Sequence, residues 1–171
     1  MAAKLEAVLG NIVDQKVEIL VTAANAELKG GGGVDGIIHK GAGPELLEAL
    51  RKLGGCPTGS AVITGAYYME STRGIKHIIH AVGPIYRDGK HGEAKLLADA
   101  YIAAMRLAED ARAGSIAFPL LSAGAYGYPL QEAATIAVQT LRAEAKTAKG
   151  LKLVRLVAFD DKALDAVRAV P

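Results

Sequence analysis

The most informative part of this chain is the stretch Ala23-Ala24-Asn25-Ala26-Glu27-Leu28-Lys29-Gly30-Gly31-Gly32-Gly33-Val34-Asp35-Gly36. It directly follows Glu18–Thr22, a segment rich in β-branched residues that we predict to be a strand. Four consecutive glycines cost backbone entropy, so packing alone does not explain them. Because glycine permits unusual dihedral angles and lets the backbone come close to a ligand, we predict a ligand-binding loop at the end of a strand. A flexible surface turn is the alternative interpretation.

A short helix, Val34–Lys40, is predicted after the glycines. Asp35 and His39 are four residues apart on this helix, so they project from the same face. A carboxylate beside an imidazole suits proton transfer, which makes both residues candidates for catalysis. The alternative is that Asp35 complements the helix dipole and that His39 is an ordinary packed or surface histidine.

The glycines at positions 31, 33 and 36 also match the dinucleotide pattern G-x-G-x-x-G. That pattern requires glycines directly after a strand, and here Asn25–Lys29 separates the strand from the glycines. No G-x-x-x-x-G-K-[ST] phosphate loop is present in the chain. A dinucleotide-binding fold of the Rossmann type is therefore disfavoured.

Strand-like and helix-like segments alternate along the rest of the chain. The further predicted strands are Leu5–Leu9, Ala61–Thr64, His77–Val82, Ser115–Phe118 and Leu153–Phe159, and the further predicted helices are Pro44–Leu53, Glu93–Arg112, Leu130–Lys146 and Lys162–Ala169. Such alternation predicts an α/β fold with a largely parallel sheet covered by helices on both faces. Ligands of these folds bind at the carboxyl ends of the strands.

A second glycine-containing loop, Phe118–Pro129, leaves one of these strands and opens a long helix. The small residues Ser122, Ala123, Gly124 and Ala125 allow successive backbone amides to face an anion. The positive end of the following helix would add to that potential, so the segment suits a diphosphate. Tyr126 could place its ring over a bound sugar. The alternative is an ordinary strand-to-helix turn with a surface tyrosine.

Composition limits the class of protein. The chain has 171 residues, of which 51% are hydrophobic and 22% charged, and its formal net charge is +2. The length predicts one domain, and the small net charge argues against binding of extended nucleic acid. The single cysteine, Cys56, excludes an intrachain disulfide and is interpreted as structural, because no basic partner is near it in sequence. No signal peptide or membrane span is recognisable, so we expect a cytoplasmic protein without membrane partners.

Together these motifs resemble the macrodomain family, specifically its MacroD-type hydrolase branch, over nearly the whole chain. The matching blocks are Gly10-Asn11-Ile12, Ala23-Ala24-Asn25, Gly30–Asp35, Gly36–His39, Cys56–Gly59, His80–Pro84, Ser115–Pro119 and Ser122–Pro129. The resemblance implies a three-layer α/β/α fold with a mixed, largely parallel central sheet, formed by a single macrodomain over residues 1–171. It also implies a cleft for ADP-ribose, free or attached to a protein. No feature of the sequence specifies an oligomeric state.

The resemblance also implies a role for each matching residue. Asn11 would face the adenine amino group, Ile12 and Ala24 would supply contacts, and Phe159 would stack on adenine. The diphosphate would be held between Gly31, Gly32, Gly33 and Val34 on one side and Ser122, Ala123, Gly124, Ala125 and Tyr126 on the other. Asn25 would hold the distal ribose, and Asp35, with His39, would serve hydrolysis.

Three positions depart from the family pattern. Asn11 stands where the family usually has aspartate, which removes a charge from the adenine contact. Thr22 stands where the family's Asn-Ala-Ala-Asn begins, and Ala123 replaces the commoner threonine of Ser-Thr-Gly. The backbone amide at position 123 remains, so the diphosphate loop should survive.

The resemblance implies hydrolysis of ADP-ribosyl esters on aspartate or glutamate, or of O-acetyl-ADP-ribose. Asp35 would position or deprotonate a water, and no cofactor is required. No metal is expected, because His39, His77, His80 and His91 show no arrangement with carboxylates or cysteine typical of a metal site. The alternatives are a non-catalytic reader of ADP-ribose, a protein that binds poly-ADP-ribose or RNA ends, and a phosphatase acting on ADP-ribose 1″-phosphate.

Overall fold

The computed structural model describes residues 2–171 and contains a six-stranded mixed sheet. The strands are β1 (Lys4–Leu9), β2 (Ile19–Ala23), β3 (Ala61–Gly65), β4 (His77–Ala81), β5 (Ser115–Phe118) and β6 (Leu153–Ala158). Their order across the sheet is β1-β6-β5-β2-β4-β3, and every pair is parallel except β3 with β4. The predicted largely parallel sheet is confirmed, with one antiparallel strand at its edge.

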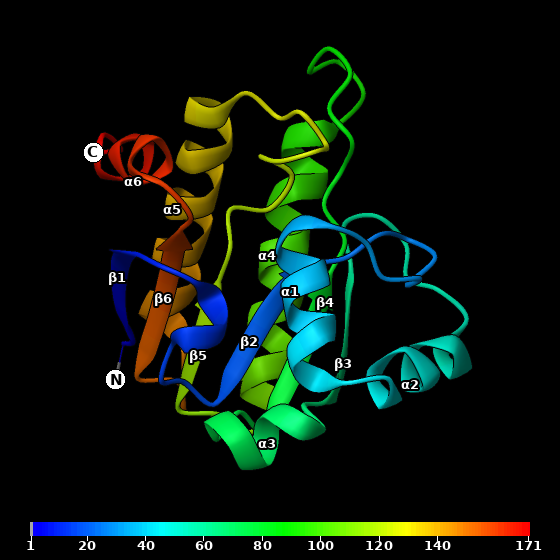
Figure 1. The fold of residues 1–171 in the computed structure, drawn as a ribbon. Helices are drawn as coiled ribbons and strands as arrows, with labels where there is room; N and C mark the ends of the chain where they lie inside the picture. Colours follow the sequence, from blue (N-terminus) through cyan, green and yellow to red (C-terminus); the bar gives the residue numbers. More distant parts are fainter. Residues whose placement is uncertain (1) are drawn as a thin grey trace.

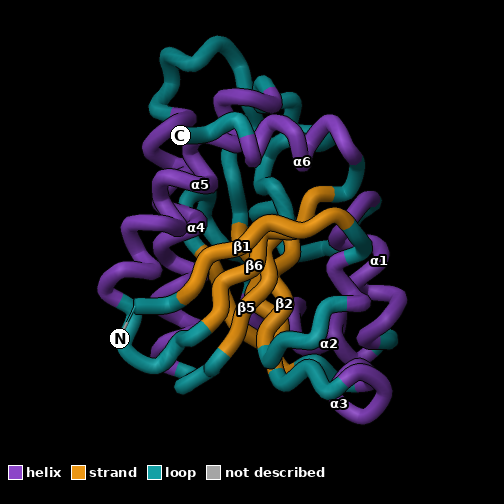
Figure 2. Tube along the Cα trace, turned by 90° about the vertical axis from the view of Figure 1, so that its left-hand side faces the viewer, coloured by secondary structure: helices purple, strands orange, loops and turns teal. Residues whose placement is uncertain are grey.

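Helices cover both faces of this sheet. The helices α1 (Gly33–Ala42), α2 (Glu45–Leu53) and α3 (Tyr68–Arg73) lie on one side, and α4 (Glu93–Asp110) and α5 (Leu130–Thr147) lie on the other (Figure 1). The last helix, α6 (Asp161–Arg168), packs beside α5 and the edge strand β1. Figure 2 shows the resulting three layers from the side. None of the helices in residues 2–171 combines the length and the apolar character needed to cross a lipid bilayer.

Most predicted elements agree with the observed ones to within two residues at each end. Two short elements were missed, namely α3 and the 3-10 turn η1 (Ile12–Asp14). The 3-10 turn forms because the Asn11 side chain accepts a hydrogen bond from the backbone amide of Val13. Both elements are shorter than two helical turns, so neither carries a hydrophobic period that a sequence pattern can reveal. Glu18 lies outside β2, where its carboxylate accepts the backbone amide of Gly114.

The strand period of two determines which side chains meet α1. In β2, Ile19 and Val21 pack with α4 and α5, whereas Leu20 packs on the side of α1. Thr22 follows Leu20 by two residues and therefore also faces α1. The same alternation in β4 turns His80 toward α1, and Thr22 and His80 are direct neighbours across the two strands. The fold thus places a hydroxyl and an imidazole beneath the helix that carries Asp35.

Candidate functional site

Two cavities lie along the carboxyl ends of the strands. The first has a volume of about 320 Å³ and the second about 400 Å³, and they share the walls Gly33, Val34, Pro119, Leu120 and Gly124. The shared walls come from the two loops predicted to hold a diphosphate. The two cavities are therefore compartments of one elongated cleft, divided where the two loops approach each other.

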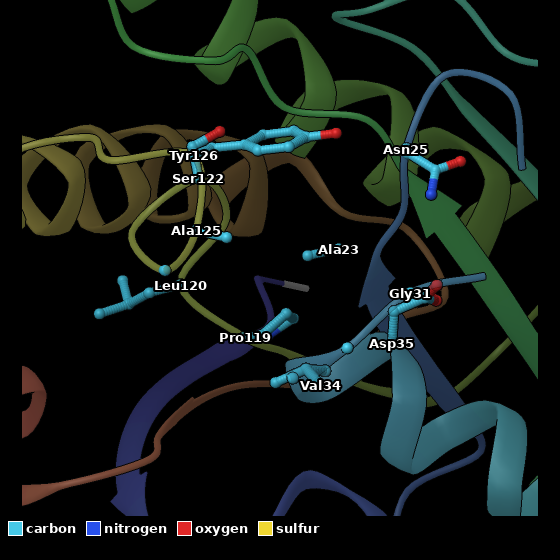
Figure 3. A pocket seen from close by; sticks show the side chains of 13 residues that line it. Ala23, Asn25, Gly31, Val34, Asp35, Pro119, Leu120, Ser122, Ala125 and Tyr126 are labelled. Carbon is cyan, nitrogen blue, oxygen red and sulfur yellow. The ribbon is translucent and has the colours of Figure 1, made fainter. Parts of the chain in front are cut away.

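The first compartment contains Asp35 but not His39, the other candidate for catalysis. It is lined by Asn25 and Asp35 from the first loop and by Ser122, Ala125 and Tyr126 from the second. Figure 3 shows Tyr126 extending over the top of this compartment toward Asn25, with Asp35 on the wall below. The predicted residues of the two loops are thus brought together, although about 90 positions separate them in sequence.

Asp35 is a buried carboxyl group at the start of α1, with only 4% of its surface exposed. Thr22 Oγ1 donates a hydrogen bond of 2.8 Å to Asp35 Oδ1. Burial raises the pKa of Asp35 above its ordinary value, and the Thr22 hydrogen bond and the nearby His39 oppose that rise. A carboxyl group with a raised pKa inside a cleft is suited to accept a proton near neutral pH.

His39 and His80 lie behind Asp35. His39 Nε2 is 3.6 Å from Asp35 Oδ1, which is too long for a hydrogen bond, and the His39 and His80 rings are 6.5 Å apart. Thr64 Oγ1 donates to the Gly65 carbonyl, so it must accept from His80 Nε2, 2.9 Å away. His80 Nδ1 then carries no proton, and burial lowers the pKa of His80 to about 3, with a smaller contribution from His39. His80 is therefore a neutral, packed histidine.

The first glycine loop is held in shape by its own side chains and backbone. Asn25 Nδ2 donates to the Gly30 carbonyl at 2.8 Å, and Asn25 Oδ1 accepts the Lys29 amide at 3.0 Å. Gly33 begins α1 with φ +57°, a conformation that favours glycine. A Cβ on Gly36 would stand 2.8 Å from the Gly31 carbonyl oxygen, so this glycine allows the loop to lie directly against the helix.

The second loop is anchored through Ser122. Ser122 adopts φ +66°, which is unusual for a residue with a side chain, and its Oγ donates a 2.7 Å hydrogen bond to the Pro84 carbonyl. Its own carbonyl accepts the Tyr128 amide at 2.9 Å. Gly124 and Ala125 follow on the cleft wall, and the start of α5 at Leu130 borders the second compartment. The loop is thus fixed before any ligand binds.

The second compartment is largely apolar and carries Phe159. Phe159 is 72% exposed and lies on the wall with Val157 and Leu120, which gives a flat ring available for stacking. Ala123 also lines this compartment. Three predicted contacts, Asn11, Ile12 and Ala24, line neither compartment. Ile12 and Ala24 are buried, and the Asn11 oxygen is occupied by the Val13 amide.

Several residues that line the cleft were not predicted from the sequence. The walls also include Ala23, Ile37, Pro119, Leu120, Leu130, Val157, Asp160, Lys162 and Ala163. Most are apolar residues, which no chemical pattern distinguishes from the core, and most of them lie in helices or strands. Thr22 could have been found, because strand alternation alone places it on the face of the sheet toward the helix that bears Asp35.

The prediction about histidines and metals needs one correction. Asp88, His91 and Glu93 place their ligand atoms within 4.8 Å of one another, the single grouping of this kind in residues 2–171. The Glu93 oxygens already accept four backbone amides, those of Arg87, Asp88, Gly89 and His91. His91 Nδ1 and Asp88 Oδ1 are 2.8 Å apart. This grouping therefore forms a hydrogen-bond network that fixes the shape of the loop.

Cys56 is buried, which raises the pKa of its thiol and agrees with a structural role.

Comparison with known protein families supports the resemblance seen in the sequence. A family model described as Macro domain matches residues 21–137, which include both cleft loops. A macro domain-containing protein of Caldanaerobacter subterraneus is 48% identical over 166 residues, covering 95% of this chain and 92% of the relative. A protein of Escherichia fergusonii named O-acetyl-ADP-ribose deacetylase is 48% identical over 145 residues, covering 82% and 80% of the two chains.

Solved structures with the same fold contain nucleotides. A glycine-to-valine mutant of the Oceanobacillus iheyensis macrodomain with ADPR superposes with a TM-score of 0.90 at 37% identity, covering 98% of this chain and 91% of that chain. A Trypanosoma brucei macrodomain in complex with ADP-ribose gives a TM-score of 0.85 at 31% identity, covering 95% and 67%. The likeness extends over nearly the whole chain.

Proposed function

Because the chain belongs to the macrodomain family, we propose that its cleft binds ADP-ribose and that it hydrolyses esters formed on the distal ribose of that ligand. The observation that carries this proposal is the buried Asp35 in a compartment whose walls are two loops of mostly glycine and other small residues. The name of the Escherichia fergusonii relative and the nucleotides bound to the structural neighbours support it.

Each part of the cleft suits a different chemical group of ADP-ribose. The apolar compartment beside Phe159 suits the adenine base, because an exposed aromatic ring gains most from stacking a base. The diphosphate suits the narrow part between Gly33 and Gly124, where backbone amides and the N-terminus of α1 favour an anion. The distal ribose then falls in the compartment of Asn25 and Asp35.

In the proposed reaction, a water molecule attacks the carbonyl carbon of the ester. The ionised Asp35 carboxylate accepts a proton from that water as the carbon–oxygen bond forms. The bond between the carbonyl carbon and the ribose oxygen then breaks, the ribose oxygen takes the proton back from Asp35, and the released acid loses its remaining proton to solvent. The products are ADP-ribose and a carboxylate, which is acetate or a protein side chain. Tyr126 covers the sugar, and the residues named here supply this chemistry without a metal.

The test uses two substrates, O-acetyl-ADP-ribose and a protein mono-ADP-ribosylated on glutamate. We expect the parent protein to release ADP-ribose from both, and we expect Asp35→Ala to lose at least about a hundredfold in rate, the lower range for removing a general base. Asp165→Ala, at an exposed acid on α6, is the matched control and should keep full activity. Calorimetry with ADP-ribose runs in parallel.

Each outcome is decisive. Binding of ADP-ribose without turnover of either ester would contradict the hydrolase assignment and leave a reader of ADP-ribose. Release of phosphate from ADP-ribose 1″-phosphate, with no ester turnover, would indicate a phosphatase instead. Full activity in Asp35→Ala would show that this carboxyl group is not the base.

A further inference from the structure

We propose that the loop Gly83–Gly92 is the docking surface for the polypeptide that carries the ADP-ribosyl group, an inference that rests on the proposed function. This loop joins β4 to α4 and projects beyond the helices, next to the second cleft loop (Figure 1). It lines neither cleft compartment. Its contacts nevertheless connect it to one end of the cleft only.

The loop is attached to the compartment that holds Asp35. The Tyr86 amide donates a 2.9 Å hydrogen bond to the Tyr126 carbonyl, and the Pro84 carbonyl accepts from Ser122 Oγ at 2.7 Å. Tyr126 and Ser122 line the Asp35 compartment and not the Phe159 compartment. A polypeptide attached through an ester on the distal ribose must extend out of the cleft at this end. It therefore emerges beside the loop.

The loop is rigid although it is exposed. The buried carboxylate of Glu93 accepts the amides of Arg87, Asp88, Gly89 and His91 at distances between 2.6 and 3.2 Å. The Tyr86 ring packs against Tyr128, with ring centroids 4.8 Å apart. A surface that is already ordered avoids the entropy cost of ordering when it binds a partner.

Two side chains that this loop presents, those of Ile85 and Arg87, are exposed, and neither takes part in a hydrogen bond or ion pair within the described part of the chain. Ile85 is 62% exposed, so its aliphatic side chain is available for an apolar contact directly beside the cleft end that holds Asp35. Arg87 is exposed, and none of the ion pairs within residues 2–171 includes Arg87 or Lys90. An apolar contact next to free donors suits a polypeptide, whose backbone carbonyls and carboxylates accept hydrogen bonds.

A small ester such as O-acetyl-ADP-ribose has an acetyl group where the polypeptide would be. It ends inside the Asp35 compartment and has no atoms to contact Ile85 or Arg87. The loop therefore adds binding energy for protein substrates only. Removal of the Ile85 and Arg87 side chains should change the preference between the two substrates without changing the chemistry.

The experiment measures kcat/KM of the full chain on both substrates for the double variant Ile85→Ser/Arg87→Ala. We expect kcat/KM on a protein mono-ADP-ribosylated on glutamate to fall about fivefold or more, the effect of truncating side chains that contribute to an interface. The value on O-acetyl-ADP-ribose should stay within twofold of the parent, as should the melting temperature within a degree or two. The matched control is Lys52→Ala/Leu53→Ser, because Leu53 is a similarly exposed aliphatic residue at the far end of α2.

Equal losses on both substrates, or no loss on the protein substrate, would overturn the docking proposal while leaving the proposed function standing. Absence of turnover of either substrate by the parent protein would instead refute the proposed function. If kcat/KM on the protein substrate falls equally in the control variant, the loss is a general surface effect, and this result would also overturn the docking proposal.

Discussion

The Thr22 hydroxyl offers the sharpest test of the chemistry, through the substitution Thr22→Val. Thr22 is fully buried, and its Oγ1 donates a 2.8 Å hydrogen bond to Asp35 Oδ1. Valine keeps the size and branching of threonine but replaces the hydroxyl with a methyl group. The substitution therefore removes one stabilising contact of the ionised carboxylate and leaves burial and His39 unchanged.

The size of the effect follows from the strength of this hydrogen bond. A hydrogen bond to a charged group contributes about 1.5–3 kcal/mol. Because about 1.4 kcal/mol corresponds to one pKa unit, the pKa of Asp35 should rise by about one to two units in Thr22→Val. The pKa of Asp35 is already raised by burial, so the substitution moves it further in the same direction.

The assay is the pH dependence of kcat/KM for O-acetyl-ADP-ribose, which reports ionisation of the free enzyme. Asp35 must be ionised to accept a proton, so activity falls as the pH drops through its pKa. The acidic limb of the Thr22→Val profile should lie about one to two units above that of the parent. At alkaline pH, where Asp35 is ionised in both proteins, the two rates should approach each other. Thr22→Ser keeps the donor, and its profile should coincide with the parent profile.

An acidic limb at the same pH in Thr22→Val, Thr22→Ser and the parent would refute this reasoning. It would mean that Asp35 is not the group that titrates, or that Thr22 does not act on it. A uniform loss of activity at every pH would instead assign Thr22 a purely structural role. Both outcomes differ clearly from a displaced limb with a common plateau.

Three further predictions concern the cleft and its rim. Phe159→Ala should weaken ADP-ribose binding about 5- to 150-fold in calorimetry, since stacking contributes about 1–3 kcal/mol per base, and an unchanged Kd would place the base elsewhere. Gly36→Ala should weaken binding at least about tenfold, because its Cβ would press on the Gly31 carbonyl, whereas Gly41→Ala on the same helix meets only the flexible Met69 side chain and should bind normally. Burial acts to raise the pKa of Glu93, but hydrogen bonds from backbone amides outweigh it and lower the pKa to about 2. The Glu93 carboxylate therefore stabilises the fold above about pH 4.5, and this contribution disappears between about pH 4.5 and 2. Glu93→Gln should therefore lose less stability than the parent over that interval in acid denaturation, and an equal loss would contradict the assignment.

The sheet, the large helices and the two cleft loops were predictable from the sequence for a physical reason. Buried parallel strands need apolar, β-branched residues, and exposed helices need an apolar stripe, so both leave periodic patterns. The glycine run and the small residues Ser122–Ala125 stood out because such runs let the backbone come close to a ligand. Contacts inside the loops could not be predicted in this way. The Asn25 amide pairs with Gly30 and Lys29, and only the folded loop defines these partners.

The second compartment was predictable only in part. Its walls come from three segments that are far apart in sequence, and most are aliphatic residues such as Leu120 and Val157. The resemblance assigns both Phe159 and Asn11 to adenine; Phe159 lines this compartment, whereas the Asn11 side chain caps the turn that follows it and does not line it. The capping preference of asparagine explains this local hydrogen bond, because a short polar side chain next to free backbone amides pairs locally, and the adenine contact of Asn11 stays a prediction.

Asp35 is the position where the local chemistry opposes the stability of the fold. Burial raises the pKa of its carboxyl group, so the protonated form is favoured in the folded protein and ionisation at neutral pH costs stability. A single hydroxyl, that of Thr22, and the nearby His39 offset part of this cost. A residue selected for packing would not be a carboxylic acid at this place, since an apolar side chain of the same size would stabilise the core. The acid at position 35 is therefore best explained by the proposed hydrolysis, in which its neighbours would serve to keep it ionised when the substrate arrives.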